Sequence, residues 1–184
     1  NRDELDEVTG ATLNGFGNVL GISGTSGRFS AELEWKRTII VPGGLAITPL
    51  FAVRGDALTV DTSDLVRAEA FRAIGTAGLD VRWPVLFSTT SATHILEPVV
   101  QIFARNNERY AGELPNEDAQ SFVFDAANLL ERDKFSGWDR IEGGTRANFA
   151  LRYSGTYSNG WSANALFGQS YHLAGQNPFA SPDL

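Results

Sequence analysis

The sequence predicts an all-β fold: an antiparallel up-and-down transmembrane β-barrel segment of about six or seven long strands. Three observations predict it: apolar and polar residues alternate with a period of two, several alternating segments run over about 10–13 residues, and short connections alternate with long ones. A 12-residue strand is about 40 Å long, and a tilt of about 45° brings its projection to about 28 Å. That length fits the roughly 30 Å hydrocarbon core of a bilayer. Soluble antiparallel sheets also alternate, so strand length and the order of connections favour the membrane barrel.

The predicted strands carry apolar residues on one side only. In 29–35, for example, Glu32 and Glu34 lie between apolar odd positions. The six clear segments are 29–35, 45–54, 71–87, 93–105, 145–157 and 161–171, and residues 10–23 are a weaker seventh candidate. Membrane barrels of this kind need at least eight strands, and lipid does not tolerate open sheet edges. We therefore expect residues 1–184, which lack an initiator methionine, to be one partial barrel domain, an incomplete barrel.

The connections indicate which end of each strand faces which side of the membrane. Short connections are predicted at 41–44, 88–92 and 158–160, and long ones at 55–69, at 106–144 and from about 173 onward. Short turns are expected on the periplasmic side and long loops outside the cell. On this scheme Trp83, Tyr157 and Trp161 lie near the short turns, where an aromatic girdle is expected. Within the second long connection, 125–132 is predicted to form one short loop helix, with Asp125 as its N-cap.

Composition excludes several function classes. The net charge is −7, with 15 basic against 22 acidic residues, so a nucleic-acid partner is not expected. The absence of cysteine excludes disulfides, thiolate catalysis and cysteine-based zinc sites. Two histidines are too few for a histidine-rich metal site. No cofactor and no metal are therefore predicted.

Three prolines lie within the strand patterns and remove ladder donors there. Pro49, Pro84 and Pro98 each predict a bulge or bend. The alternative is a functionally weakened seam between neighbouring strands.

Two pairs of titratable residues are candidates for a catalytic or metal site. His94 and Glu97 are three positions apart, which places them on opposite faces of a strand. Glu32 and Glu34 share a face about 7 Å apart, a spacing that acid–base chemistry permits, as in glycosidases. A polar strand face of mixed charge also explains them. We predict no catalytic residue and no enzymatic activity.

The two faces of the predicted wall have different environments. The apolar face, with residues such as Phe29, Leu33, Trp35, Val100 and Phe149, is expected to meet lipid. Ten polar side chains are expected to line a wet lumen: Glu32, Glu34, Arg72, Asp80, Arg82, Glu97, Gln101, Arg105, Arg146 and Arg152.

The stretch FSGWDRIEGGTRAN, residues 135–148, combines charged residues with two glycines where the long loop re-enters a strand. Asp139, Arg140 and Glu142 are predicted to form a structural network with Arg146 that ties the loop to the barrel interior. The alternative is an active site made from the same charged residues.

Three motifs in a fixed order resemble the barrel of the LptD family, the lipopolysaccharide-assembly proteins of the outer membrane. They are H-x-L-E-P within 93–105, F-S-G-x-D-R within 114–153, and G-Q-x-Y within 165–173, and the hairpin 35–56 also fits. The resemblance covers about 28–179, is strongest to the alphaproteobacterial branch, and implies the middle part of the barrel.

The resemblance implies a very large barrel plugged by an LptE-type lipoprotein. It further implies a periplasmic jellyroll that receives lipopolysaccharide from a protein bridge, and a lateral opening from which the lipid leaves. We find neither the jellyroll nor the terminal barrel strands in this sequence, and the family's disulfide cysteines are absent. The family's proline-weakened gate lies near the first barrel strands, so the resemblance implies no gate role for Pro49, Pro84 or Pro98.

The leading hypothesis is therefore outer-membrane lipopolysaccharide transport and assembly, with insertion of the lipid into the outer leaflet. A general porin or other channel would share the same wall pattern. The third possibility is a soluble β-sandwich that binds carbohydrate, or hydrolyses it with Glu32 or Glu97.

Overall fold

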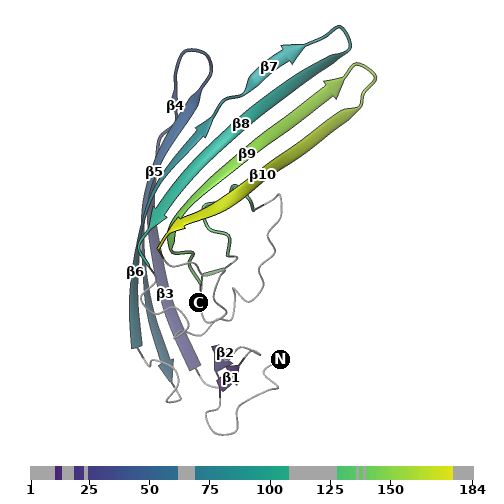
Figure 1. Cartoon of the computed structure of the whole chain (residues 1–184). Coiled ribbons are helices and arrows are strands. Elements are labelled where there is room, and N and C mark those ends of the chain that lie inside the picture. Colours follow the sequence, from purple (N-terminus) through teal and green to yellow (C-terminus); the bar gives the residue numbers. More distant parts are fainter. Residues whose placement is uncertain are drawn as a thin grey trace.

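The computed structural model describes residues 11–13, 19–22, 25–61, 69–107, 128–135, 137–138 and 140–175. In these residues the secondary structure is strand and turn, and no helix is long and apolar enough to span a bilayer. One large curved sheet dominates the molecule (Figure 1). The predicted all-β, antiparallel, up-and-down fold is confirmed.

The large sheet has the strand order β10-β9-β8-β6-β5-β3, so each strand lies beside its neighbours in the chain. Two short strands extend it, because β4 pairs with β5 and β7 pairs with β8. All pairings are antiparallel and the sheet does not close, so the wall is an incomplete barrel. The strands are β3 (Thr25–Lys36), β4 (Ile39–Ile40), β5 (Ala46–Asp61), β6 (Glu69–Arg82), β7 (Val85–Ser88), β8 (Ala92–Arg105), β9 (Gly144–Tyr157) and β10 (Ser162–Ala174).

Prolines explain why β4 and β7 are separate strands. The register of β3 on β5 continues unchanged into β4, and the interruption at Arg37 lies opposite Pro49. The Arg37 amide donates to the Pro49 carbonyl over 3.3 Å, but proline has no N–H to donate in return. Trp83 and Pro98 repeat this arrangement at the break between β6 and β7, with one bond of 3.1 Å. Each proline therefore costs its ladder one hydrogen bond without shifting the register.

The prediction of a seventh long strand at 10–23 is wrong. That region contains β1 (Ala11–Leu13) and β2 (Val19–Ile22), which pair with each other in a separate two-stranded sheet. β3 begins at Thr25, before the start of the strand predicted at 29–35. The sequence pattern failed here because a four-residue strand and a three-residue strand are too short to show alternation.

The tight connections all lie at one end of the sheet, the upper end in Figure 1. Val41–Leu45 closes the first hairpin, Thr89–Ala92 the second and Tyr157–Trp161 the third, each through a backbone hydrogen bond of 2.8–2.9 Å. Gly43, Gly44 and Gly160 have positive φ there, a conformation that glycine adopts without strain. The predicted helix at 125–132 lies partly outside the described residues. Its described part is a turn, in which the Glu131 amide donates to the Asn128 carbonyl over 3.1 Å.

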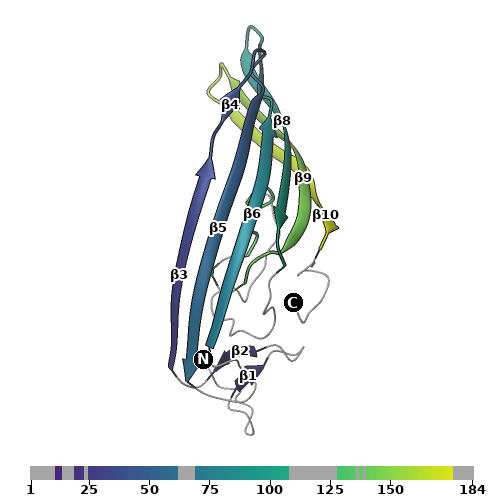
Figure 2. The same ribbon diagram turned by 90° about the vertical axis from the view of Figure 1, so that its left-hand side faces the viewer.

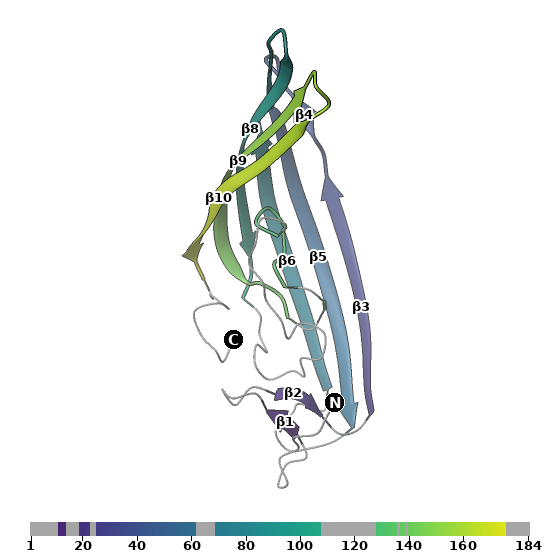
Figure 3. The same cartoon turned by 90° about the vertical axis from the view of Figure 1, so that its right-hand side faces the viewer.

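The described part of the β8–β9 connection lies against the concave face of the sheet (Figures 1 and 3). We call residues 128–143, of which 136 and 139 are not described, the inner segment. Leu129, Phe135 and Ile141 of this segment are buried against the wall. From the opposite side, Figure 2 shows β3, β5 and β6 in front of it.

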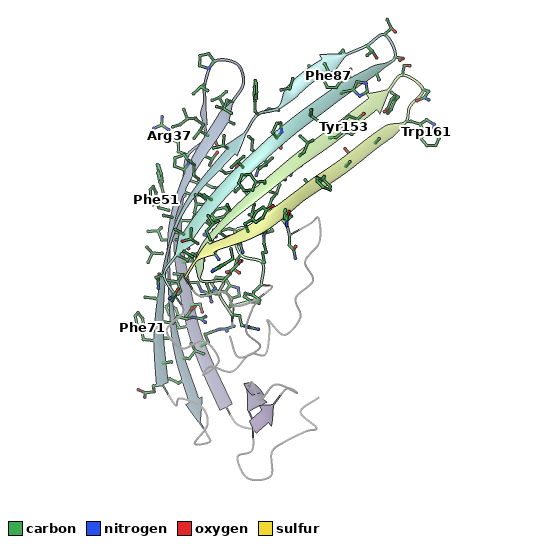
Figure 4. The ribbon with its side chains drawn as sticks, in the orientation of Figure 1. Arg37, Phe51, Phe71, Phe87, Tyr153 and Trp161 are labelled. Carbon is green, nitrogen blue, oxygen red and sulfur yellow. The ribbon has the colours of Figure 1, made fainter. Side chains whose placement is uncertain are left out.

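The convex face is apolar and exposed. Phe29, Leu33, Phe71 and Phe167 are 68–83% exposed, as expected for side chains that have no protein neighbour. Figure 4 shows Phe51 and Phe71 projecting away from the concave side. The molecule therefore buries charged side chains on the concave face and exposes apolar side chains on the convex face, the reverse of a soluble protein.

Candidate functional site

The strand register places all ten predicted lumen residues on the concave face. Residues directly opposite each other in an antiparallel ladder project to the same side. Asp80 lies opposite Gln101, and Glu97 lies opposite Arg152. The remaining predicted residues lie on the same face, because they share it with three further opposite pairs. These pairs are Asp56 with Arg72, Glu32 with Arg54, and Phe103 with Arg146. Whether this face lines a lumen stays a prediction.

Arg54, Asp56 and Arg72 form one buried cluster of charges in the wall. Asp56 has no exposed surface and Arg72 is 1% exposed. The Asp56 carboxylate accepts hydrogen bonds from Nε of Arg54 over 3.0 Å and from Nε of Arg72 over 2.8 Å. Both arginines also donate to the carbonyl of Trp138 in the inner segment, over 2.5 and 2.8 Å. The indole of Trp138 lies 4.4 Å from the Arg54 guanidinium, a cation–π contact.

Sequence reasoning missed Arg54 and Asp56 as site residues. Its predicted strand ended at Arg54, whereas β5 continues to Asp61. The signal was present, because both residues lie at even positions, out of phase with the apolar odd positions Phe51 and Val53. Their burial could not be foreseen, because it depends on a segment that returns about eighty residues later.

A second cluster joins β8 and β9 to the inner segment. Arg105 donates to the carbonyl of Glu142 over 2.7 Å and also to the carbonyl of Arg132. Arg146 donates to the same Arg132 carbonyl over 3.2 Å and forms an ion pair with the Glu142 carboxylate. Asp133 lies 3.7 Å from Arg105. The wall here presents cations and the inner segment supplies carbonyls and carboxylates.

At β3 the charges are the other way round, because the wall supplies carboxylates and the inner segment supplies a cation. Arg132 forms ion pairs with Glu32 and, over 2.8 Å, with Glu34. Both predicted carboxylates are therefore paired with this arginine, and Glu34 also pairs with Lys36 over 3.0 Å, which suits a structural contact. Chain positions about one hundred residues apart are connected in this way.

Closer to the tight turns, the remaining predicted residues pair within the wall. Arg82 forms an ion pair with Asp80 over 2.8 Å, and Gln101 donates to the same carboxylate over 2.5 Å. Glu97 and Arg152 form a partly exposed ion pair over 3.0 Å. Asn148, which has no exposed surface, donates to Gln101 over 3.0 Å.

Of the three predicted loop-anchor residues, two are described. Glu142 is 5% exposed and contacts Arg105, Arg146 and the amide of Lys134. The Arg140 guanidinium lies 4.7 Å from the Phe135 ring, a cation–π contact within the inner segment. Asp139 lies outside the described residues. The anchoring role of these residues stays a prediction.

Lys134 is an inner-segment cation buried beside wall cations. Its ammonium donates to the carbonyls of Asn128 and Leu129 over 3.3 and 2.9 Å. Burial, together with the positive charges of Arg146 and Arg105, lowers the pKa of Lys134 to about 7. The inner segment therefore carries a group that titrates near neutral pH. Sequence reasoning had no signal for it.

His94 and Glu97 lie on opposite faces of β8, as expected from their spacing. His94 is on the convex side, where its Nδ1 lies 2.8 Å from the Tyr153 hydroxyl and its ring stacks on Phe87. Trp161 and Trp83 are exposed beside the tight turns, and the Trp83 indole donates to the Gly43 carbonyl over 2.9 Å. Figure 4 shows Phe87, Tyr153 and Trp161 at the turn end of the sheet. Among the described residues, no group of three histidine or acidic side chains could hold a metal ion.

The arrangement described so far is a curved wall with an apolar outside, a charged inside and a segment docked on its charges. The family model of LptD, LPS transport system D, matches residues 2–183. The chain belongs to the LptD family. LptD proteins act in lipopolysaccharide transport and assembly in the outer membrane, and lipopolysaccharide is their substrate. No curated protein sequence matches the chain. The LptD barrel accounts for the open sheet, the long strands and their two faces.

Proposed function

We propose that this chain forms part of the wall of a large barrel that inserts lipopolysaccharide into the outer leaflet, without enzymatic chemistry. The separation of the two faces supports the proposal most strongly. Polar residues on β3, β5, β6, β8 and β9 share the concave face, while the convex face carries large exposed hydrocarbon side chains. A polar saccharide passes along the first face, and acyl chains are solvated beside the second.

The proposal includes partners and a place in the full barrel. An LptE-type lipoprotein would fill the concave side, and a periplasmic bridge protein would deliver the lipid to a jellyroll domain. We further propose that the chain is of alphaproteobacterial type and comes from the middle of the barrel. Motif order supports both statements, since H-x-L-E-P, F-S-G-x-D-R and G-Q-x-Y occur in that sequence.

The alternatives receive less support. The described strands β3–β10 form one curved sheet, and β1 and β2 are too short to form the second layer of a sandwich. A diffusion porin would share the wall, but membership of a lipopolysaccharide-transport family favours transport of that lipid.

Conditional depletion of the full-length protein in its own bacterium tests the proposal. Surface lipopolysaccharide should fall as the protein is depleted, and re-expression should restore it. Depletion of an unrelated porin is the matched control and should leave surface lipopolysaccharide unchanged. Normal surface lipopolysaccharide after depletion, together with channel conductance of the purified protein, would support the porin instead.

A further inference from the structure

Four arginines of the wall converge on the same region under the inner segment. We call Arg54, Arg72, Arg105 and Arg146 the arginine patch. They form two pairs on adjacent strands, one on β5 and β6 and one on β8 and β9, and none is more than 9% exposed. Arg54 and Arg105 line one small cavity of about 20 Å³, which Thr76 and Asp133 also line. That volume is about enough for one water molecule.

Each arginine pair converges on one neutral oxygen atom. The Trp138 carbonyl accepts from Arg54 and Arg72, and the Arg132 carbonyl accepts from Arg105 and Arg146. Two guanidinium groups directed at one oxygen form a geometry that suits an oxyanion, and hydrogen bonds between charged partners are about twice as strong as neutral ones. The inner segment therefore occupies these N–H donors with neutral carbonyl oxygens, which are weaker acceptors than the oxyanion that the donors could bind.

The charge balance of the arginine patch leaves it positive. Asp56 in β5 and Glu142, at the end of the inner segment two residues before β9, form ion pairs with the arginine patch. Two further carboxylates lie near Arg105: Asp133, in the middle of the inner segment, and Glu32, in β3. Glu32 of β3 also lines the cavity that Arg54 and Arg105 share, so four arginines face three carboxylates and a surplus of one positive charge remains when residues 128–141 are displaced. In addition, Nε of Arg146 has no hydrogen-bond partner among the described residues although the side chain is buried.

We propose that the arginine patch is a phosphate-binding site for the phosphorylated saccharide of the transported lipid, and that the Arg132 and Trp138 carbonyls cover it when no substrate passes. This inference rests on the proposed function. The inner segment acts as an internal competitor, because the same donors cannot bind its carbonyls and a phosphate group at once. Phosphate suits the patch better than a neutral sugar, since each guanidinium pair supplies several N–H donors in fixed directions.

The test uses the full-length protein, purified with its lipoprotein partner, and a variant whose residues 128–141 are replaced by a glycine–serine linker. Line broadening in phosphorus NMR reports binding of two probes, inorganic phosphate and glucose phosphate. Both should bind the linker variant and bind the unaltered protein at least about tenfold more weakly. Unphosphorylated glucose should not displace them.

Point variants in the linker background assign the binding to the patch. Arg105→Gln and Arg146→Gln should each weaken binding about tenfold, the effect of one lost charge-assisted contact. Arg37→Gln removes the same charge from the opposite face, where Figure 4 shows Arg37, and should leave binding unchanged. If the linker variant fails to fold, Arg132→Ala, which removes the ion pairs to Glu32 and Glu34, replaces it.

Three results would overturn the inference. The first is that displacing the inner segment does not increase phosphate binding. The second is that Arg37→Gln weakens binding as much as Arg105→Gln. The third is that inorganic phosphate binds but glucose phosphate does not, which would indicate a site for free anions. Each leaves the proposed function intact if depletion still lowers surface lipopolysaccharide, so the two proposals fail separately.

Discussion

Asp56 and Arg72 face each other across the β5–β6 ladder and form an ion pair of 2.8 Å with almost no access to solvent. The pair lies on the concave face of the sheet, and Arg54 shares its carboxylate. Removing one partner of a buried ion pair is costly because the remaining charge keeps its desolvation penalty. The wall therefore depends on this carboxylate more than on any exposed one.

Asp56→Asn should lower the free energy of unfolding of the full-length protein by about 3–5 kcal/mol. Two buried arginines lose their carboxylate in this variant. Urea unfolding in detergent, followed by heat-modifiable gel mobility, measures the change. The control is Glu97→Gln, whose partner Arg152 is 44% exposed and whose loss should cost about 0–1 kcal/mol. Equal losses in both variants would contradict the prediction.

Gly168→Val should disturb both the β9–β10 pairing and the docking of the inner segment. A Cβ atom at this position would lie 2.5 Å from the Phe149 carbonyl oxygen and 2.7 Å from Leu129. We expect the free energy of unfolding to fall by about 1–3 kcal/mol, the usual cost of overpacking. Gly55→Ala is the matched control, because a Cβ there meets nothing within 4 Å. Protease cleavage within 108–143, increased in Gly168→Val and unchanged in Gly55→Ala, is the measurement.

Docking of the inner segment should strengthen as pH rises from about 7 toward 10.5. Lys134 has a pKa of about 7 when docked and an ordinary value near 10.5 when released, so the released state binds more protons in this window. Raising the pH removes the cost of deprotonating Lys134 on docking. Arg105 and Arg146 face this group from the wall, and Glu142, Asp133 and Glu131 face it from its own segment.

Proteolysis of the β8–β9 connection at a series of pH values checks this dependence. Lys134→Met has no titrating ammonium and should show a flat profile across the same window. A pH dependence of equal size in Lys134→Met would assign the effect to another group.

Pro98→Ala should stabilise the β6–β8 ladder by about 0.5–1.5 kcal/mol. The Trp83 amide already donates to the residue 98 carbonyl over 3.1 Å, and alanine supplies the N–H that completes the pair. The added bond should slow amide hydrogen exchange in β7 and β8. Pro84→Ala, which does not complete this pair, is the control. Faster exchange in Pro98→Ala would show that the proline serves another purpose.

The two faces of the wall could be predicted from the sequence because strand alternation is local. The alternation within β8 and within β9 indicates on which face Glu97 and Arg152 lie, and the register of the two strands then places these residues opposite each other. The burial of Arg72 could not be predicted in this way. It depends on the carbonyl of Trp138, which no pattern in β6 can indicate. The prediction of a helix at 125–132 rested on local propensity. In residues 128–132 the chain instead follows the wall, where the Arg132 carbonyl accepts from Arg105 and Arg146 and the Leu130 carbonyl accepts from Gln101.

The reach of the inner segment also constrains the order of folding. Arg132 contacts β3, Trp138 contacts β5 and β6, Glu142 contacts β8 and β9, and Leu129 lies against Gly168 of β10. Its contacts span up to one hundred positions of sequence separation, and such contacts form late because the chain between them must first be ordered. Docking of this segment can be complete only once all six long strands are in register. Its protection from protease would therefore time the end of wall assembly in a refolding experiment.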